Sequence, residues 1–243
     1  MDDDELVRSD ERLHDPSRVL ALSDGVFAII LTLLVLEIHL PEFGPGQTLV
    51  DAMRTIRPSF TAFLISFVVV AIAWAGHRDL FALIRRTDRP LVWLNILYLL
   101  PLSILPFGAS LIANYEAESV ALRLYGFLLV AIGASRLAIW MYATRRPRLL
   151  YSAVDRQSRR AGVAIVAVPG VAYAIAILVA AAAPTASLVI YAAVPAVYSS
   201  ASRSLAPPVG LDRPSRTSHK GTVDAGTPAS RRCGTLGVSR GRT

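Results

Sequence analysis

Six apolar segments, each close to the length of a membrane span, constrain this 243-residue chain more than any other feature. About 20 residues of helix cross the roughly 30 Å hydrocarbon core of a bilayer, because each residue rises about 1.5 Å. The segments run over residues 18–40, 58–84, 91–113, 119–142, 161–183 and, more briefly, 186–201. The sequence therefore predicts an all-α membrane protein with six transmembrane helices per subunit.

Polar segments flank this predicted membrane domain, which we place at residues 18–201. Residues 1–17 are acidic, unlike the basic start of a signal peptide, so we expect no cleaved signal. The segment 202–243 is rich in Ser, Pro, Gly and Arg, and residues 203–243 supply +6 of the net charge of +7. This composition predicts a disordered basic tail that lies beside an anionic leaflet, and we expect no nucleic-acid partner.

The charges of the loops predict how the helices are oriented. Arginines gather at 85–89 and at 145–160, whereas the alternate loops at 41–57 and 114–118 carry most of their charge as carboxylates. Cytoplasmic loops of membrane proteins carry an excess of Lys and Arg. We therefore expect both termini in the cytoplasm and the protein in the plasma membrane.

The first segment, residues 18–40, presents two different faces when its residues are placed about 100° apart. A stripe of large aliphatic side chains runs along its whole length: Leu22, Val26, Ile29, Leu33 and Leu36. Asp24 points away from this stripe, and Ser23 sits off its edge. Two interpretations are open. The stripe faces lipid, or it lines a pore that is closed by the exclusion of water.

Polar residues in the next two helices are candidate partners for the carboxylate of Asp24. An unpartnered charge within a membrane costs several kcal/mol, on the order of +2.5 to +3.5 on insertion scales. His77 and Asn95 lie at a similar depth in the second and third helices. We expect Ser23, Asp24, His77 and Asn95 to form one hydrogen-bonded cluster.

The sequence offers little for catalysis or metal binding. The single cysteine, Cys233, lies in the polar tail, and no second ligand stands at metal-binding spacing from His77. No nucleophile or metalloprotease motif is present, so we expect no enzyme, resident metal or cofactor. Arg136, within the fourth helix, has no partner that the sequence indicates.

The segment RVLALSDGVFAIILTLLVLEI resembles the first-helix signature of the transmembrane protein 175 potassium channels, Arg-x-x-x-Phe-Ser-Asp followed by Gly-Val-x-Ala-Ile. The matching positions are Arg18, Ser23, Asp24, Gly25, Val26, Ala28 and Ile29, and Leu22 replaces the phenylalanine. AWAGHRDLF, RRTDRPLVWLNILYLL and LPFGASL are similar to the family's second and third helices. The resemblance covers about residues 15–200.

This resemblance implies a passive, potassium-selective channel that needs no cofactor. It implies a homo-oligomer, specifically a tetramer, whose pore is lined by the first helix of each subunit. Ile29 would form the constriction, with further layers at Leu33 and Leu36, and Thr32 would take part in selectivity. Arg18, Ser23 and Asp24 would bind the second and third helices instead of ions.

Other functions are compatible with the residues alone. A proton-coupled carrier could use Asp24 and His77, and its flux would require a pH gradient. A non-conducting membrane scaffold, or an intramembrane enzyme without a visible motif, would show no ion flux at all.

In the channel hypothesis, Glu37 and Glu42 lie near the predicted outer mouth and would raise the local cation concentration there.

Overall fold

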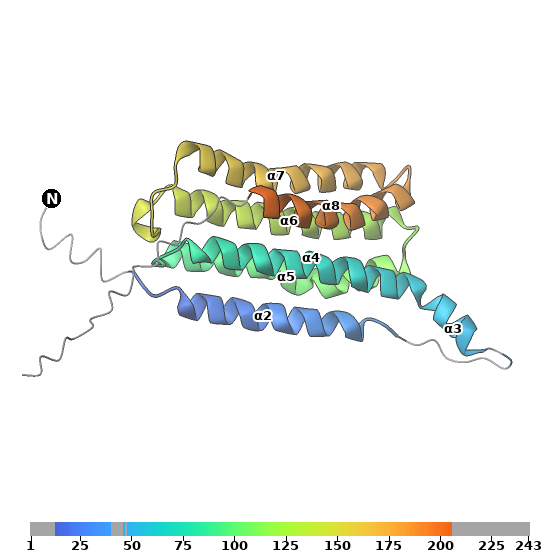
Figure 1. The fold of residues 1–243 in the computed structure, drawn as a ribbon. Coiled ribbons are helices and arrows are strands. Elements are labelled where there is room, and N and C mark those ends of the chain that lie inside the picture. Colours follow the sequence, from blue (N-terminus) through green and yellow to red (C-terminus); the bar gives the residue numbers. More distant parts are fainter. Residues whose placement is uncertain (1–12, 40–45, 47, 206–243) are drawn as a thin grey trace, which may run out of the picture. The chain divides into compact units, whose positions relative to one another are not determined.

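The structure, a computed structural model, describes residues 13–39, 46 and 48–205, with side chains described up to Val197. All regular elements in these ranges are helices (Figure 1). They are α2 (Ser17–Leu36), α3 (Leu49–Thr55), α4 (Arg57–Ala82), α5 (Arg89–Asn114), α6 (Ser119–Thr144), the 3₁₀ turn η1 (Pro147–Leu149), α7 (Arg156–Val179) and α8 (Pro184–Leu205). Residues 1–12 of the predicted acidic segment and residues 206–243 of the predicted tail lie outside the described residues.

The all-α membrane architecture predicted from the sequence is confirmed. Five helices, α2, α4, α5, α6 and α7, are long and apolar enough to span a membrane, and α8 is apolar over Pro184–Val197. The ends of some helices differ from the predicted segments: α2 ends at Leu36 instead of at residue 40, and α7 runs over Arg156–Val179 instead of 161–183. The end of the membrane domain at residue 201 stays a prediction.

The short helix α3 was not expected from the sequence. It begins with a capping box, in which the Thr48 side chain accepts a hydrogen bond from the Asp51 backbone N–H and the Asp51 carboxylate accepts one from the Thr48 N–H. Such reciprocal bonds satisfy two N–H groups that would otherwise lack partners at a helix start. Hydrogen bonds to the Asp51 carboxylate, first from the Thr48 hydroxyl and then from the Thr48 N–H, hold the Asp51 pKa below its usual range.

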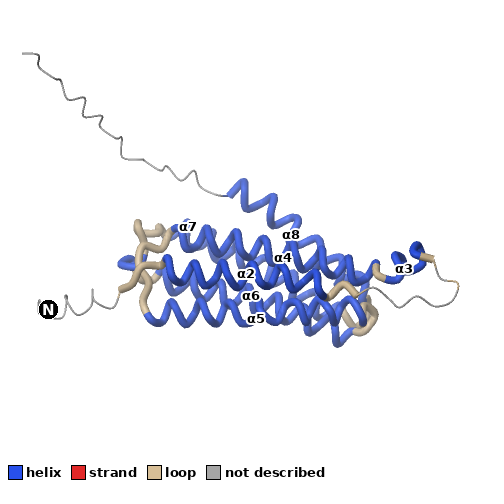
Figure 2. Tube along the Cα trace, turned by 90° about the horizontal axis from the view of Figure 1, so that it is seen from below, coloured by secondary structure: helices blue, strands red, loops and turns tan. Residues whose placement is uncertain are grey.

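α5 and α6 form the middle of the bundle, with the other long helices on either side. α2 packs against α4 and α5, whereas α7 packs against α6 and α8. In Figure 1, α2 consequently lies at one edge of the bundle and α7 at the opposite edge. The view in Figure 2 shows α2, α4, α5, α6 and α7 running nearly parallel to one another.

Buried tyrosines join the central helices, and their hydroxyls have partners. Tyr125 of α6 shares a 3.0 Å hydrogen bond with Ser66 of α4. Tyr191 of α8 donates a 2.9 Å hydrogen bond to the Leu122 carbonyl of α6. Gly126 of α6 lies directly against the Tyr191 hydroxyl, so this close approach leaves no room for a larger residue.

Loop contacts fix the end of the bundle where α2 begins. His14 and Thr87 exchange two backbone hydrogen bonds of 2.8 Å, which attach the start of α2 to the loop between α4 and α5. Asp88 caps α5 by accepting from the Leu91 N–H at 3.1 Å. The same carboxylate accepts from the Tyr142 hydroxyl at 2.8 Å, so the loop is joined to the end of α6 as well.

Candidate functional site

One face of α2 attaches this helix to the rest of the subunit. Ser23, Phe27, Ile30 and Leu34 follow one another at helical spacing and are all buried. They pack against α4 and α5, the two helices that contact α2. Lipid tails are as apolar as these side chains, so the contacts stabilise the helix through van der Waals packing, which defines its orientation.

The other face of α2 is uncovered in the single subunit. Ile29 is 59% exposed and Leu36 is 65% exposed, and Leu22 and Leu33 are exposed as well. Val26, the remaining member of the predicted stripe, is half-buried against the core. Four members of the stripe are therefore available to contact lipid, a pore or another subunit.

Thr32 lies beside this stripe and is also exposed. Its hydroxyl donates a 2.8 Å hydrogen bond to the backbone carbonyl of Ile29, one turn earlier in the helix. The hydroxyl therefore has a hydrogen-bond acceptor within its own helix and needs none from a neighbouring helix.

Three of the four polar residues expected to cluster are joined in one buried chain of hydrogen bonds. Asn95 Nδ2 donates to Ser23 Oγ at 2.9 Å, and Asn95 Oδ1 is 2.8 Å from His77 Nε2. Ser23 Oγ in turn donates to the Val19 carbonyl at 2.9 Å. The chain links α2, α4 and α5, and Asn95 occupies its centre.

The hydrogen bonds also define the state of the His77 ring. An amide oxygen can only accept, so His77 Nε2 carries the proton that is shared with Asn95. His77 Nδ1 is buried and has no hydrogen-bond partner among the described residues. The ring is stacked on Tyr98, with centroids 5.4 Å apart, and on Phe81 at 4.4 Å, so aromatic packing holds it in place.

Asp24 is not part of this chain, and the expected cluster was wrong in this respect. Its side chain is exposed on α2, and its Oδ1 accepts a 2.9 Å hydrogen bond from the indole N–H of Trp74. Arg78 lies over the Trp74 ring at 5.6 Å. Trp74 was missed from the sequence, although its position one turn before His77 on the same helix could have indicated it.

Among the described residues, Arg18 has no observed partner that tests its predicted packing role. It is exposed at the start of α2, and no described residue forms a hydrogen bond or ion pair with it. The structure therefore does not bring it together with Ser23, His77 and Asn95. Glu37 follows α2 as its C-cap residue, while Glu42 lies outside the described residues.

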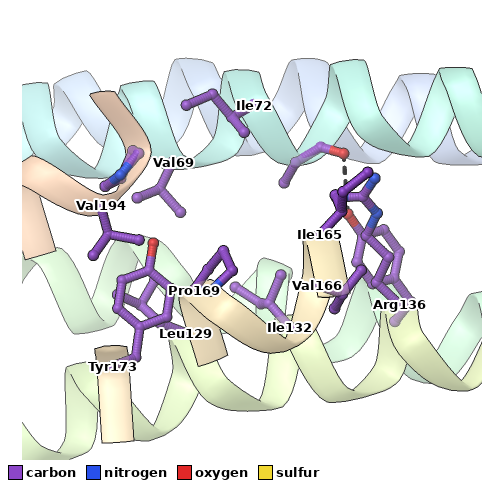
Figure 3. Close-up of a pocket in the computed structure, with 14 residues that line it drawn as sticks. Val69, Ile72, Leu129, Ile132, Arg136, Ile165, Val166, Pro169, Tyr173 and Val194 are labelled. Carbon is purple, nitrogen blue, oxygen red and sulfur yellow. Dashed lines mark hydrogen bonds between the residues drawn. The ribbon is translucent and has the colours of Figure 1, made fainter. Parts of the chain in front are cut away.

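Arg136 lies in a second region, away from α2. Its Nη2 donates a 3.3 Å hydrogen bond to the Gly76 carbonyl of α4, a partner that the sequence had not indicated. It also lines a small, mainly apolar cavity of about 80 Å³, together with residues such as Val69, Pro169 and Tyr173 (Figure 3). All the residues lining it come from α4 to α8, so this cavity is separate from the exposed stripe.

The described residues contain no group of three or more His, Cys, Asp or Glu side chains placed to hold a metal ion. Two features of α2 are candidates for a functional role. One is the exposed aliphatic stripe, and the other is the buried polar chain that attaches α2 to α4 and α5.

Comparison with known proteins identifies related channels. Residues 18–106 match the family model of the endosomal/lysosomal potassium channel TMEM175. A potassium channel of Streptomyces collinus is 37% identical over 154 residues, covering 61% of this chain and 74% of that protein. A potassium channel of Chamaesiphon minutus is 37% identical over 147 residues, covering 58% of this chain and 72% of that protein.

The fold agrees with a solved structure of the same kind. The crystal structure of a lysosomal potassium-selective channel TMEM175 homologue from Chamaesiphon minutus superposes with a TM-score of 0.69 at 29% identity. The match covers 76% of this chain and 97% of that one. The chain belongs to the TMEM175 family of ion channels.

Proposed function

We propose that this chain is a subunit of a potassium channel that conducts passively through a pore lined by α2. The observation that carries the proposal is the uncovered aliphatic stripe on a helix whose opposite face is firmly packed. The naming of its relatives as potassium channels supports the permeant ion. Its family is an ion-channel family, which is not an enzyme class.

A single α2 cannot surround a pore, so the subunit has to assemble. Cyclic symmetry is the simplest arrangement that brings the same helix face of each copy to one axis. We propose a homotetramer in which Ile29 forms the constriction and Leu33 and Leu36 form further layers. Rings of such side chains close a pore by dewetting.

The polar residues of α2 have separate roles in this proposal. Thr32, beside the Ile29 ring, contributes to selectivity between potassium and sodium. Ser23, with His77 and Asn95, keeps α2 in its orientation. Glu37, at the opposite end of α2 from Arg18, raises the local cation concentration at the pore mouth.

We also propose that the protein lies in the plasma membrane. The arginine-rich loops favour an orientation with both termini in the cytoplasm. The end of the bundle that carries His14, Thr87 and Arg146 would then be the cytoplasmic end. A proton-coupled carrier is less favoured, because Asp24 and His77 have different hydrogen-bond partners, Trp74 and Asn95.

The test is a reversal-potential measurement on purified protein in planar bilayers with opposing potassium and sodium solutions. Ile29→Asn should shift the reversal potential toward zero, because a polar ring no longer excludes water and hydrated sodium. Val35→Asn is the matched control, since Val35 is exposed on the same helix but lies roughly 120° from Ile29.

An unchanged reversal potential in Ile29→Asn, or an equal shift in Val35→Asn, would contradict the constriction. Flux into liposomes distinguishes the carrier. Potassium flux that stops when the pH gradient is collapsed would favour a carrier, whereas an absence of any ion flux would favour a scaffold.

A further inference from the structure

A polar cavity of about 360 Å³ lies at the end of the bundle where α3 meets α4. This end is opposite to the one at which α2 begins (Figure 1). The cavity is lined by residues of α3, α4, α5 and α8 and by Glu116, which follows α5. Since no α2 residue lines it, the cavity is distinct from the proposed pore.

Two arginines and one carboxylate form the rim of this cavity. Arg54 is in the last turn of α3, and Arg57 is the first residue of α4. Both are exposed, and neither guanidinium group forms a hydrogen bond or ion pair with another described residue. Glu116 is also exposed and likewise has no such partner in the described part of the chain. The rim thus carries a net positive charge that no described group neutralises.

The floor of the same cavity is apolar. Ala62, Ile65 and Ile112 are buried, and Leu188 of α8 is half-buried. A free inorganic anion gains nothing from an aliphatic floor. A rim of guanidinium groups above apolar side chains instead matches an amphiphile whose anionic headgroup continues into a hydrocarbon chain.

The position of the cavity favours a membrane lipid as that amphiphile. α4 begins at Arg57 and α5 ends at Asn114, and both helices are long and apolar enough to span a bilayer. The rim consequently lies at the depth of the lipid headgroups, and the floor lies toward the acyl chains. The first turn of α4 also presents the positive end of its helix dipole to this region.

We infer that this cavity binds the phosphate of an anionic phospholipid through Arg54 and Arg57, with the start of an acyl chain on Ile65 and Ile112. Guanidinium groups donate paired hydrogen bonds to phosphate oxygens. Glu116 opposes the phosphate charge, so it limits affinity and allows exchange with the bulk lipid.

Native mass spectrometry of the full-length protein in detergent can test this inference. The probes are phosphatidylglycerol and phosphatidylcholine of identical chain length, and the readout is the ratio of their bound populations. Each guanidinium should contribute roughly fivefold to the preference for phosphatidylglycerol. The double variant Arg54→Gln/Arg57→Gln should therefore lose most of that preference.

Two further variants keep the test decisive if the double variant folds poorly. Glu116→Gln should raise the preference for phosphatidylglycerol, because it removes the opposing charge. Arg123→Gln is the matched control, since Arg123 is an exposed arginine near the start of α6 that does not line the cavity. It should leave the ratio unchanged.

Four results would overturn the inference. They are an unchanged ratio in the double variant, an equal loss in Arg123→Gln, and a fall in the ratio in Glu116→Gln. The fourth is displacement of phosphatidylglycerol by millimolar inorganic phosphate, which would assign the rim to a free anion. If the double variant dissociates the oligomer without changing the ratio, the rim is a subunit contact and the lipid site is refuted.

Discussion

Substitution of Asn95 by leucine tests whether the buried polar chain attaches α2 to the subunit. Leucine has the same branching and number of side-chain heavy atoms as asparagine but can neither donate to Ser23 nor accept from His77. The variant removes hydrogen bonds of 2.9 and 2.8 Å between groups that are at most 1% exposed.

The expected cost follows from what each neighbour loses. Ser23 keeps its bond to the Val19 carbonyl, so it loses only an accepted bond, worth about 0.5–1 kcal/mol. His77 is left with both ring nitrogens unpaired and buried, which costs about 1–3 kcal/mol. Hydrogen bonds between membrane helices fall toward the low end of such ranges. We expect Asn95→Leu to lower the free energy of unfolding by about 2–3 kcal/mol.

A double-mutant cycle isolates the bond between His77 and Asn95. His77→Phe retains a ring that can stack on Tyr98 and Phe81, and alone it should cost about 1–2 kcal/mol, because Asn95 Oδ1 loses its partner. The double variant should be more stable than the sum of the single effects predicts, by about 1–2 kcal/mol.

The assay is reversible unfolding in mixed detergent micelles, followed by far-ultraviolet circular dichroism. Ser103→Ala serves as the control, because the Ser103 hydroxyl bonds only to the Leu99 carbonyl of its own helix. Its effect should stay within about 0.5 kcal/mol. Strict additivity of Asn95→Leu and His77→Phe would refute the hydrogen-bonded chain.

The remaining predictions concern other contacts. Gly126→Ala should destabilise the protein by about 1–3 kcal/mol, because the added methyl group overpacks against α8. Gly133→Ala on the same helix has open space around it and should stabilise the protein by up to about 1 kcal/mol. Thermal unfolding of both variants checks this pair. Trp74→Phe should lower the free energy of unfolding by about 1 kcal/mol, because it removes the hydrogen-bond donor to Asp24. Asp24→Asn should retain that bond. Chemical unfolding should therefore show that Trp74→Phe is the less stable variant. Asp155 caps α7, and its hydrogen bonds, chiefly with Ser158, hold its pKa below the usual 3.8. Its charge therefore stabilises the fold above pH 3.8, and this contribution is lost as the pH falls through the lowered pKa. The difference in melting temperature between wild type and Asp155→Asn should accordingly shrink between pH 6 and pH 3.

The sequence predicted the helices well because membrane-spanning segments are defined by length and hydropathy alone. The stripe on α2 was also predictable, since helical periodicity places Leu22, Ile29 and Leu36 on one face whatever surrounds them. Their exposure in the single subunit agrees with that periodicity. What lies opposite the stripe depends on other copies of the chain, so periodicity could not decide between lipid and a pore.

The partners of the polar residues were harder to predict, because they depend on rotation and depth of neighbouring helices. Depth alone grouped Asp24 with His77 and Asn95. One residue along a helix is about 100° of rotation, which separates Asp24 from Ser23 and directs it to Trp74 instead. α3 was missed for a different reason: its capping box stabilises only seven residues, too few for a periodic signal.

The two faces of α2 separate stability from conduction in the proposed channel. The face with Ser23, Phe27 and Leu34 holds the helix through burial and hydrogen bonds within one subunit. The face with Ile29 and Leu36 makes few contacts there, so its residues can change without a large loss of folding energy. A pore wall made of such residues can therefore vary in sequence, whereas the buried face is constrained by the fold. In the proposed channel, two kinds of residue therefore alternate along the twenty residues of α2. One kind sets the ion preference, and the other sets the position of the helix.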